Sequence, residues 1–138
     1  MSKDKGFIFG DKIQFFNPSR GEMTVEEVVT AIKQFIEDQE GDYQLIIGSD
    51  SHLHRPKKDK KMSFLELVTA IIIHRKGRGG RFFWTRIKFN RFFPLKEKIY
   101  QETLASLEMA QRLMPFCRRE FNGEFEKLEI HIDVGNNG

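Results

Sequence analysis

A glycine-rich turn between two β-rich runs constrains this chain more than any other feature. The turn is KGRGG at residues 76–80, and the runs cover 64–75 and 81–93, with Pro94 ending the second. Runs rich in β-branched and aromatic residues on both sides of a short glycine turn are typical of an antiparallel hairpin. A third apolar run, at 43–48, has the length of a buried strand, and we expect it to pair with 64–75.

Two helices and a last strand complete the expected elements. Thr24 and Glu27 have the spacing of a capping box, and apolar residues at helical spacing follow them, so we expect a helix over 25–38. A second helix is expected over 95–114, where the following proline ends it. The alternating segment 127–134 predicts a strand.

The remaining segments are expected to be less regular. Residues 1–22 are predicted to be irregular, with the turn-rich sequence FFNPSRG, and 52–62 to be a polar loop. The order helix, three strands, helix, strand predicts a mixed α/β sheet, in which a crossover helix follows three antiparallel strands and leads to a parallel fourth strand. The length of 138 residues fits one core, so we expect a single domain over 23–138 after the irregular segment.

The composition favours a cytoplasmic protein. Cys117 is the single cysteine, so no internal disulfide can form, which suits a reducing compartment. The N-terminus lacks the apolar run of a signal peptide. The longest apolar stretch, 68–73, is too short to span a membrane, so we expect no membrane association.

Basic residues gather in two segments, although the net charge is only +3. Residues 54–61 are HRPKKDKK, and 74–91 interleaves arginine and lysine with phenylalanine and tryptophan. Cations suit a phosphate backbone and aromatic rings stack on bases, but a solvated strand face backed by core aromatics would give the same pattern. The candidate nucleic-acid-binding residues are Arg55, Lys57, Lys58, Lys60, Lys61, Arg78 and Arg81.

Two aspartates lie where α/β proteins collect functional groups. Asp50 is expected just past the end of the strand at 43–48, although a turn cap is the alternative. Asp133 lies near the end of the last expected strand, and alternation puts it on the same face as His131. An aspartate in an apolar strand is costly unless it is paired or holds a cation.

Glu102 is the third acidic candidate. On a helical wheel it lies on the apolar face of the second helix, beside Leu113. Glu97 and Glu108 lie nearly opposite, where solvent is expected. We therefore expect Glu102 to be the one acidic residue of this helix that points to the sheet. The alternative is an edge glutamate that reaches solvent or pairs with an arginine.

Three carboxylates directed to one place would repel one another unless protons or cations lie between them. Oxygen-only ligands suit Mg²⁺ or Mn²⁺. Two such ions about 4 Å apart could activate a water and stabilise the leaving oxygen in phosphodiester hydrolysis. Asp50, Glu102 and Asp133 are therefore candidate metal ligands and catalytic residues, and His52 or His131 could assist proton transfer.

Five short motifs resemble the YkuK-type ribonuclease H-like family, a small bacterial group. They are FFNP at 15–18, IIGSDS at 46–51, VTAIIIHR at 68–75, GGRFFW at 79–84 and HIDVGNNG at 131–138. The resemblance covers the chain from about residue 15 onward. It implies a ribonuclease H-like fold and, by analogy, metal-dependent nuclease chemistry on nucleic acid, with RNA or an RNA–DNA hybrid among the candidate substrates.

The resemblance also implies roles for the three carboxylates. Asp50 matches the first-strand aspartate of ribonuclease H-like enzymes, Glu102 the helix glutamate and Asp133 the fourth-strand aspartate. Such enzymes normally carry a fourth acidic residue in a later helix and a fifth strand, and neither follows Gly138. We therefore expect the fold to be incomplete at the C-terminus, in a natural chain that is longer.

Two other interpretations stay open. His52 and His54 form an HxH pair, which resembles the opening motif of amidohydrolase and PHP-type metal hydrolases, although those are usually barrels of about 250 residues. The other is a non-catalytic nucleic-acid-binding or scaffolding module on a ribonuclease H-like frame, in which the basic loop and the aromatic hairpin make the contacts.

Overall fold

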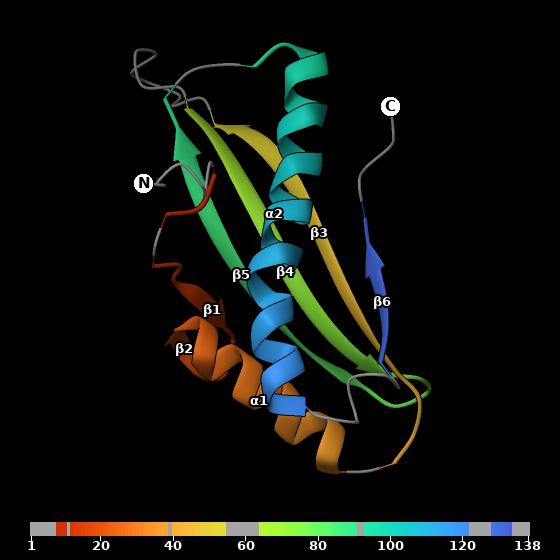
Figure 1. The fold of residues 1–138 in the computed structure, drawn as a ribbon. Coiled ribbons are helices and arrows are strands. Elements are labelled where there is room, and N and C mark those ends of the chain that lie inside the picture. Colours follow the sequence, from red (N-terminus) through yellow and green to blue (C-terminus); the bar gives the residue numbers. More distant parts are fainter. Residues whose placement is uncertain are drawn as a thin grey trace.

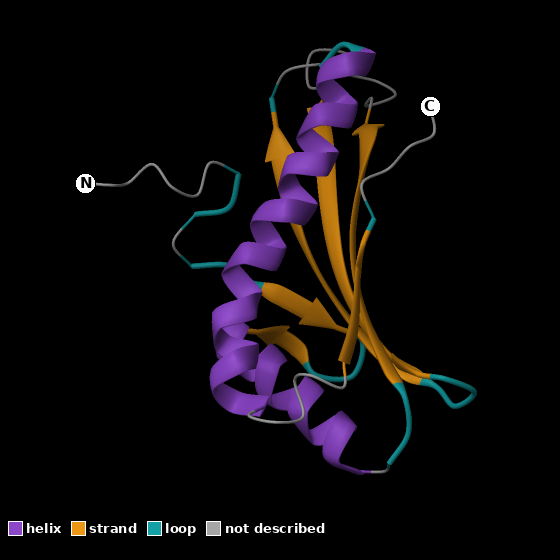
Figure 2. Ribbon diagram, turned by 45° about the vertical axis from the view of Figure 1, so that its right-hand side comes forward, coloured by secondary structure: helices purple, strands orange, loops and turns teal. Residues whose placement is uncertain are grey.

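A twisted mixed sheet with both described helices on one of its faces forms the frame of the protein (Figures 1 and 2). The computed structural model describes residues 8–10, 12–38, 40–54, 64–90, 93–121 and 128–133. Their elements are, in chain order, β1 (Phe15–Asn17), β2 (Gly21–Met23), α1 (Val25–Asp38), β3 (Tyr43–His54), β4 (Phe64–Arg75), β5 (Gly80–Phe89), α2 (Leu95–Phe121) and β6 (Leu128–Ile132). The described strands lie in the order β2-β1-β5-β4-β3-β6.

The centre of the sheet confirms the predicted topology. β3, β4 and β5 pair antiparallel in chain order, and β6 returns through α2 to lie parallel to β3. The hairpin turn between β4 and β5 is the predicted KGRGG segment, closed by a hydrogen bond from Arg75 N to Gly79 O of 3.1 Å. Gly80 is required here, because a Cβ atom at this position would lie 2.6 Å from the carbonyl oxygen of Ile73.

Three predictions about the limits of strands were wrong. The strand predicted over 81–93 is β5, which ends at Phe89. The first predicted strand continues past 48 to His54, since β4 supplies a partner for each polar residue up to the pair of His54 and Phe64. Residues 15–17 and 21–23 are not irregular, because β1 pairs with the outer edge of β5 and β2 folds back on β1. Strands of three residues are too short to show a period in the sequence.

The first helix has the predicted bounds and the predicted cap. Thr24 and Glu27 exchange hydrogen bonds, from Thr24 N to Glu27 Oε1 at 2.8 Å and from Glu27 N to Thr24 Oγ1 at 3.1 Å. These bonds satisfy backbone donors that a helix N-terminus leaves without partners. The capping box is therefore confirmed.

The second helix does not end at Pro115, which was predicted to stop it. It continues to Phe121, because Cys117 and Phe121 extend the apolar face of Leu113 at helical spacing and are almost fully buried. Proline leaves the carbonyl four residues earlier without its usual donor. That residue is Gln111, which is exposed, so water can satisfy the carbonyl.

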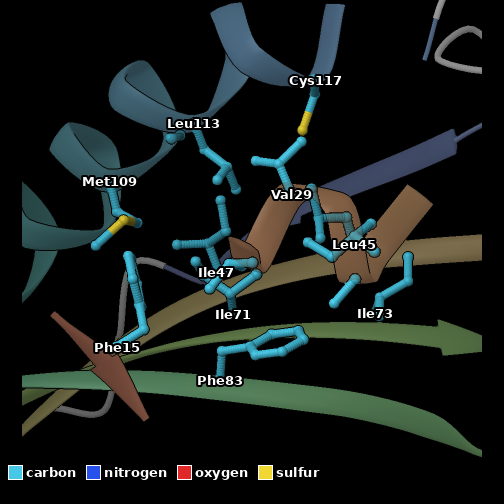
Figure 3. Packing of buried hydrophobic residues seen from close by; sticks show 14 of the residues in the cluster. Phe15, Val29, Leu45, Ile47, Ile71, Ile73, Phe83, Met109, Leu113 and Cys117 are labelled. Atoms are coloured by element: carbon cyan, nitrogen blue, oxygen red, sulfur yellow. The ribbon is translucent and has the colours of Figure 1, made fainter. Parts of the chain in front are cut away.

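The core lies between the helices and one face of the sheet (Figure 3). Side chains of α2, including Met109 and Leu113, meet those of Leu45, Ile47 and Ile71 from the central strands. Burial raises the pKa of the Cys117 thiol to about 12, so this side chain acts as a small apolar core residue.

The opposite face of the sheet has no helix over it in the described part of the chain (Figure 2). On this open face Phe82 is 46% exposed, whereas its neighbour Phe83, on the core face, is 1% exposed. None of the described helices is long and apolar enough to cross a bilayer.

Candidate functional site

The candidate site lies along the edge of β3 beyond the end of β6. The carbonyl of Ile47 accepts a hydrogen bond from Asp133 N at 2.8 Å, so the backbone groups of odd-numbered β3 residues face β6. β6 ends at Ile132, opposite Ile47, and accompanies only the lower part of β3 in Figure 1. The N–H of Ser51 therefore lies past the last β6 residue and takes its acceptors from side chains.

Two of the three predicted carboxylates share this N–H group. Ser51 N donates to Asp50 Oδ1 at 3.0 Å and to Glu102 Oε2 at 2.9 Å. The Ser51 hydroxyl also donates to Glu102 Oε2, at 2.5 Å. Glu102 reaches the edge of β3 from the helix side, and Asp50 reaches it from the open face, so the two carboxylates are close neighbours.

The spacing of helix and strand explains how Glu102 comes to face Ser51. Four residues of a helix rise about 6.0 Å, and two residues of a strand rise about 6.7 Å. Ser106, four residues after Glu102, donates to Ser49 Oγ at 2.9 Å, and Ser49 bonds Thr69 Oγ1 at 2.8 Å. This pair of serines, with Ser106 buried and Ser49 partly buried, fixes the rotation of α2, and the preceding helical turn then places Glu102 beside Ser51.

Lys98 is a functional candidate that the sequence analysis missed. Its ammonium lies 2.9 Å from Glu102 Oε2, one turn earlier on α2. Burial of Glu102 alone would raise the pKa of its carboxyl, but the hydrogen bonds from Ser51 and Lys98 and the charge of Lys98 outweigh it. The pKa therefore lies below the ordinary value of 4.5. The spacing of four residues between Lys98 and Glu102 was the available signal.

The lowered pKa predicts how the stability of the protein depends on pH. Because the folded-state pKa is below the unfolded value, ionised Glu102 contributes stability that is present above about pH 4.5 and lost as the pH falls through the folded pKa. We expect the stability advantage of the wild type over Glu102→Gln to be full at pH 6 to 7 and to shrink at lower pH. Urea unfolding of both proteins across this range measures it, and an advantage that grew on acidification would contradict the assignment.

The third carboxylate, Asp133, lies directly after β6 and beside Gly48 on the open face. A Cβ atom at Gly48 would lie 3.3 Å from Asp133 Cβ and 3.5 Å from its Oδ2, so a larger residue would press on the aspartate. Gly48 thus lets Asp133 lie against β3, two residues from Asp50. The structure brings Asp50 and Glu102 together at Ser51, and it puts Asp133 beside Gly48, two residues before Asp50 on β3.

His52, His54 and His131 lie on the open face, each beside an acidic partner. His52 Nε2 is 3.3 Å from Asp50 Oδ2, and His131 Nε2 is 3.4 Å from Glu129 Oε2. His54 shares the face of His52, as an HxH pair requires, but its ring contacts Glu66 at 3.0 Å. The two histidines of the HxH pair are therefore engaged by different carboxylates.

The predicted basic residues are only partly described. Arg55, Lys57, Lys58, Lys60 and Lys61 lie outside the described residues. Arg78 is exposed in the β4–β5 turn, and the Arg81 guanidinium lies 4.9 Å from the ring centre of Phe35. Both are distant in the fold from Glu102, since they lie at the opposite end of the hairpin.

Two placements of acidic residues were wrong. Asp50 lies inside β3, and the expectation that it follows the strand fails because β4 pairs beyond it. Glu108 is 7% exposed, although the helical wheel directed it to solvent. Its carboxylate accepts hydrogen bonds from Ile8 N at 3.0 Å and Phe9 N at 3.1 Å, because the N-terminal segment packs on this side of α2. Glu102 is thus not the one buried acid of the helix.

The donors at the site have the chemistry of a hard cation site. Asp50, Glu102 and Asp133 offer carboxylate oxygens, which Mg²⁺ and Mn²⁺ prefer. Among the described residues, no three histidine, cysteine, aspartate or glutamate side chains are grouped closely enough to hold a metal. The three residues therefore fit such an ion in donor type but are not gathered around one point, and Glu102 already has a cation, Lys98, at one oxygen.

Comparison with known proteins places the chain in a family. The model of the family described as Ribonuclease H-like matches residues 27–138. The chain is also 30% identical to the "Uncharacterized protein YkuK" of Bacillus subtilis (strain 168), over 93% of this chain and 77% of that protein. No solved structure matches. The strand order β5-β4-β3-β6, the crossover helix and these two matches agree, and the chain belongs to the YkuK-type ribonuclease H-like family.

Proposed function

We propose that the protein is a divalent-metal-dependent nuclease that hydrolyses phosphodiester bonds in nucleic acid. The observation that carries the proposal is the convergence of Asp50 and Glu102 on the N–H of Ser51, at the edge of β3 where Asp133 also lies. Family membership supports the same chemistry by analogy, because a fold alone does not establish a function.

Each residue of the site has a separate part in this proposal. Asp50, Glu102 and Asp133 would hold Mg²⁺ or Mn²⁺, which supplies Lewis-acid activation of water and of the scissile phosphate. Ser51 orients Glu102 through its backbone N–H and its hydroxyl. His52, which lies beside Asp50 on the open face, would accept or release a proton close to the carboxylates.

Metal binding is the first test. We expect Mn²⁺ to bind the wild-type chain by isothermal titration calorimetry, and Asp133→Asn to weaken binding at least about tenfold, because amide oxygen carries no charge for the cation. Asp42→Asn is the matched control, since Asp42 is exposed at the opposite end of β3. The proposal is rejected if Mn²⁺ does not bind the wild type, or if it binds the wild type and Asp133→Asn with equal affinity.

A second candidate is a nucleic-acid-binding module without catalysis. It is favoured by the aromatic row on the open face, where the rings of Phe82 and Trp84 stack at 5.5 Å and Phe16 lies 6.2 Å from Trp84. Arg86 covers the Phe16 ring at 5.6 Å, which adds a cation beside the rings. Nucleic-acid binding that survives chelation by EDTA and the Asp50→Asn substitution, without cleavage, would favour this candidate.

A further inference from the structure

The pair of Lys98 and Glu102 differs from an ordinary surface pair on a helix. Lys33 and Glu37 on α1 have the same spacing, but their charged atoms are 3.9 Å apart and the glutamate side chain is 54% exposed. Lys98 and Glu102 are 2.9 Å apart, and the Glu102 side chain is only 11% exposed. A carboxylate with so little solvent needs a counter-charge nearby, and Lys98 supplies it.

The hydrogen bonds to Glu102 are concentrated on one oxygen. Oε2 accepts from Ser51 N, from Ser51 Oγ and from Lys98 Nζ. Three donors fill the lone pairs of a carboxylate oxygen. A divalent cation can therefore bind Oε2 only if a donor leaves, and a cation that approaches Oε1 instead meets the repulsion of the Lys98 ammonium at short range.

Lys98 is the donor that can leave. The N–H of Ser51 is fixed in the backbone of β3, whereas the lysine ammonium stands on a flexible four-carbon stem that is 32% exposed. We propose that Lys98 is a built-in counter-cation, which holds Glu102 in the metal-free protein and competes with the divalent ion for it. This inference rests on the proposed metal site and describes how the loading of that site is regulated.

The test is a Mn²⁺ titration of the purified chain by calorimetry. Lys98→Met removes the competing charge, and we expect the Mn²⁺ affinity to rise about three- to tenfold. Lys98→Gln, which keeps a hydrogen-bond donor without the charge, should also raise it, and Lys98→Arg should keep the wild-type affinity. Lys33→Met removes the same charge from an equivalent helix position on α1 and should leave the affinity unchanged.

The outcomes separate this inference from the proposed function. If Mn²⁺ binding depends on Glu102 but has the same affinity in the wild type, Lys98→Met and Lys98→Gln, the role of Lys98 is overturned and the metal site stands. Absence of Mn²⁺ binding in the wild type and in all Lys98 variants would remove the metal site and the inference together. If Lys98→Met does not fold, as judged by circular dichroism, Lys98→Gln decides the result.

Discussion

Substitution of Asp50 by asparagine is expected to reduce metal-dependent cleavage of nucleic acid at least about 100-fold without changing the fold. The carboxylate is one of the two that meet at Ser51 N–H, and asparagine keeps its shape but not its charge. The Asp50 side chain is 67% exposed, so the free energy of unfolding should change by about 0.5 kcal/mol or less. Cleavage of labelled RNA, RNA–DNA hybrid and single-stranded DNA with Mn²⁺ measures the first effect, and urea unfolding the second.

Two controls make this result specific to the carboxylate site. Asp42→Asn removes one charge at the far end of β3 and should cleave like the wild type. EDTA should abolish cleavage by the wild type, and added Mn²⁺ should restore it. Cleavage by Asp50→Asn at the wild-type rate would show that the nuclease activity comes from elsewhere in the chain or from a contaminant.

Much of the fold could be predicted because its signals are local. The strand 64–75 and the helix 25–38 were predicted with the bounds that the structure shows, since alternation, a glycine turn and a capping box mark their ends. The errors come from non-local partners. β3 continues to His54 because β4 is there to pair with it, and α2 passes Pro115 because the core accepts Cys117.

The candidate site shows the same division. The helical wheel put Glu102 on the sheet side, which its burial confirms, but it could not show that Ser51 and Lys98 share one oxygen of that side chain. Glu108 was misplaced because the residues that bind it lie about 100 positions earlier in the chain. The assignment of Asp50, Glu102 and Asp133 as metal ligands stays a prediction.

Substitution of Phe83 by alanine is expected to give a large loss of stability. Phe83 is 1% exposed and belongs to the core cluster on the helix side of β5. Removal of a buried phenylalanine side chain costs about 3–5 kcal/mol, from lost apolar burial and from the cavity that remains. Guanidinium unfolding at 25 °C, followed by circular dichroism, should show this loss or an unfolded protein.

The adjacent residue Phe82 is the matched control, because it has the same side chain in the same strand but faces the open side of the sheet. With 46% of Phe82 exposed, Phe82→Ala should cost about 1 kcal/mol, mainly through the stacking on Trp84. A difference of about 2 kcal/mol or more between the two variants would confirm that the core lies on the face of α1 and α2.

Equal losses of stability would contradict the open face, because Phe82 can contribute as much as Phe83 only if something covers it in solution. Unfolding at two protein concentrations then decides whether that cover is a second copy of the chain, since stability gained by association rises with concentration.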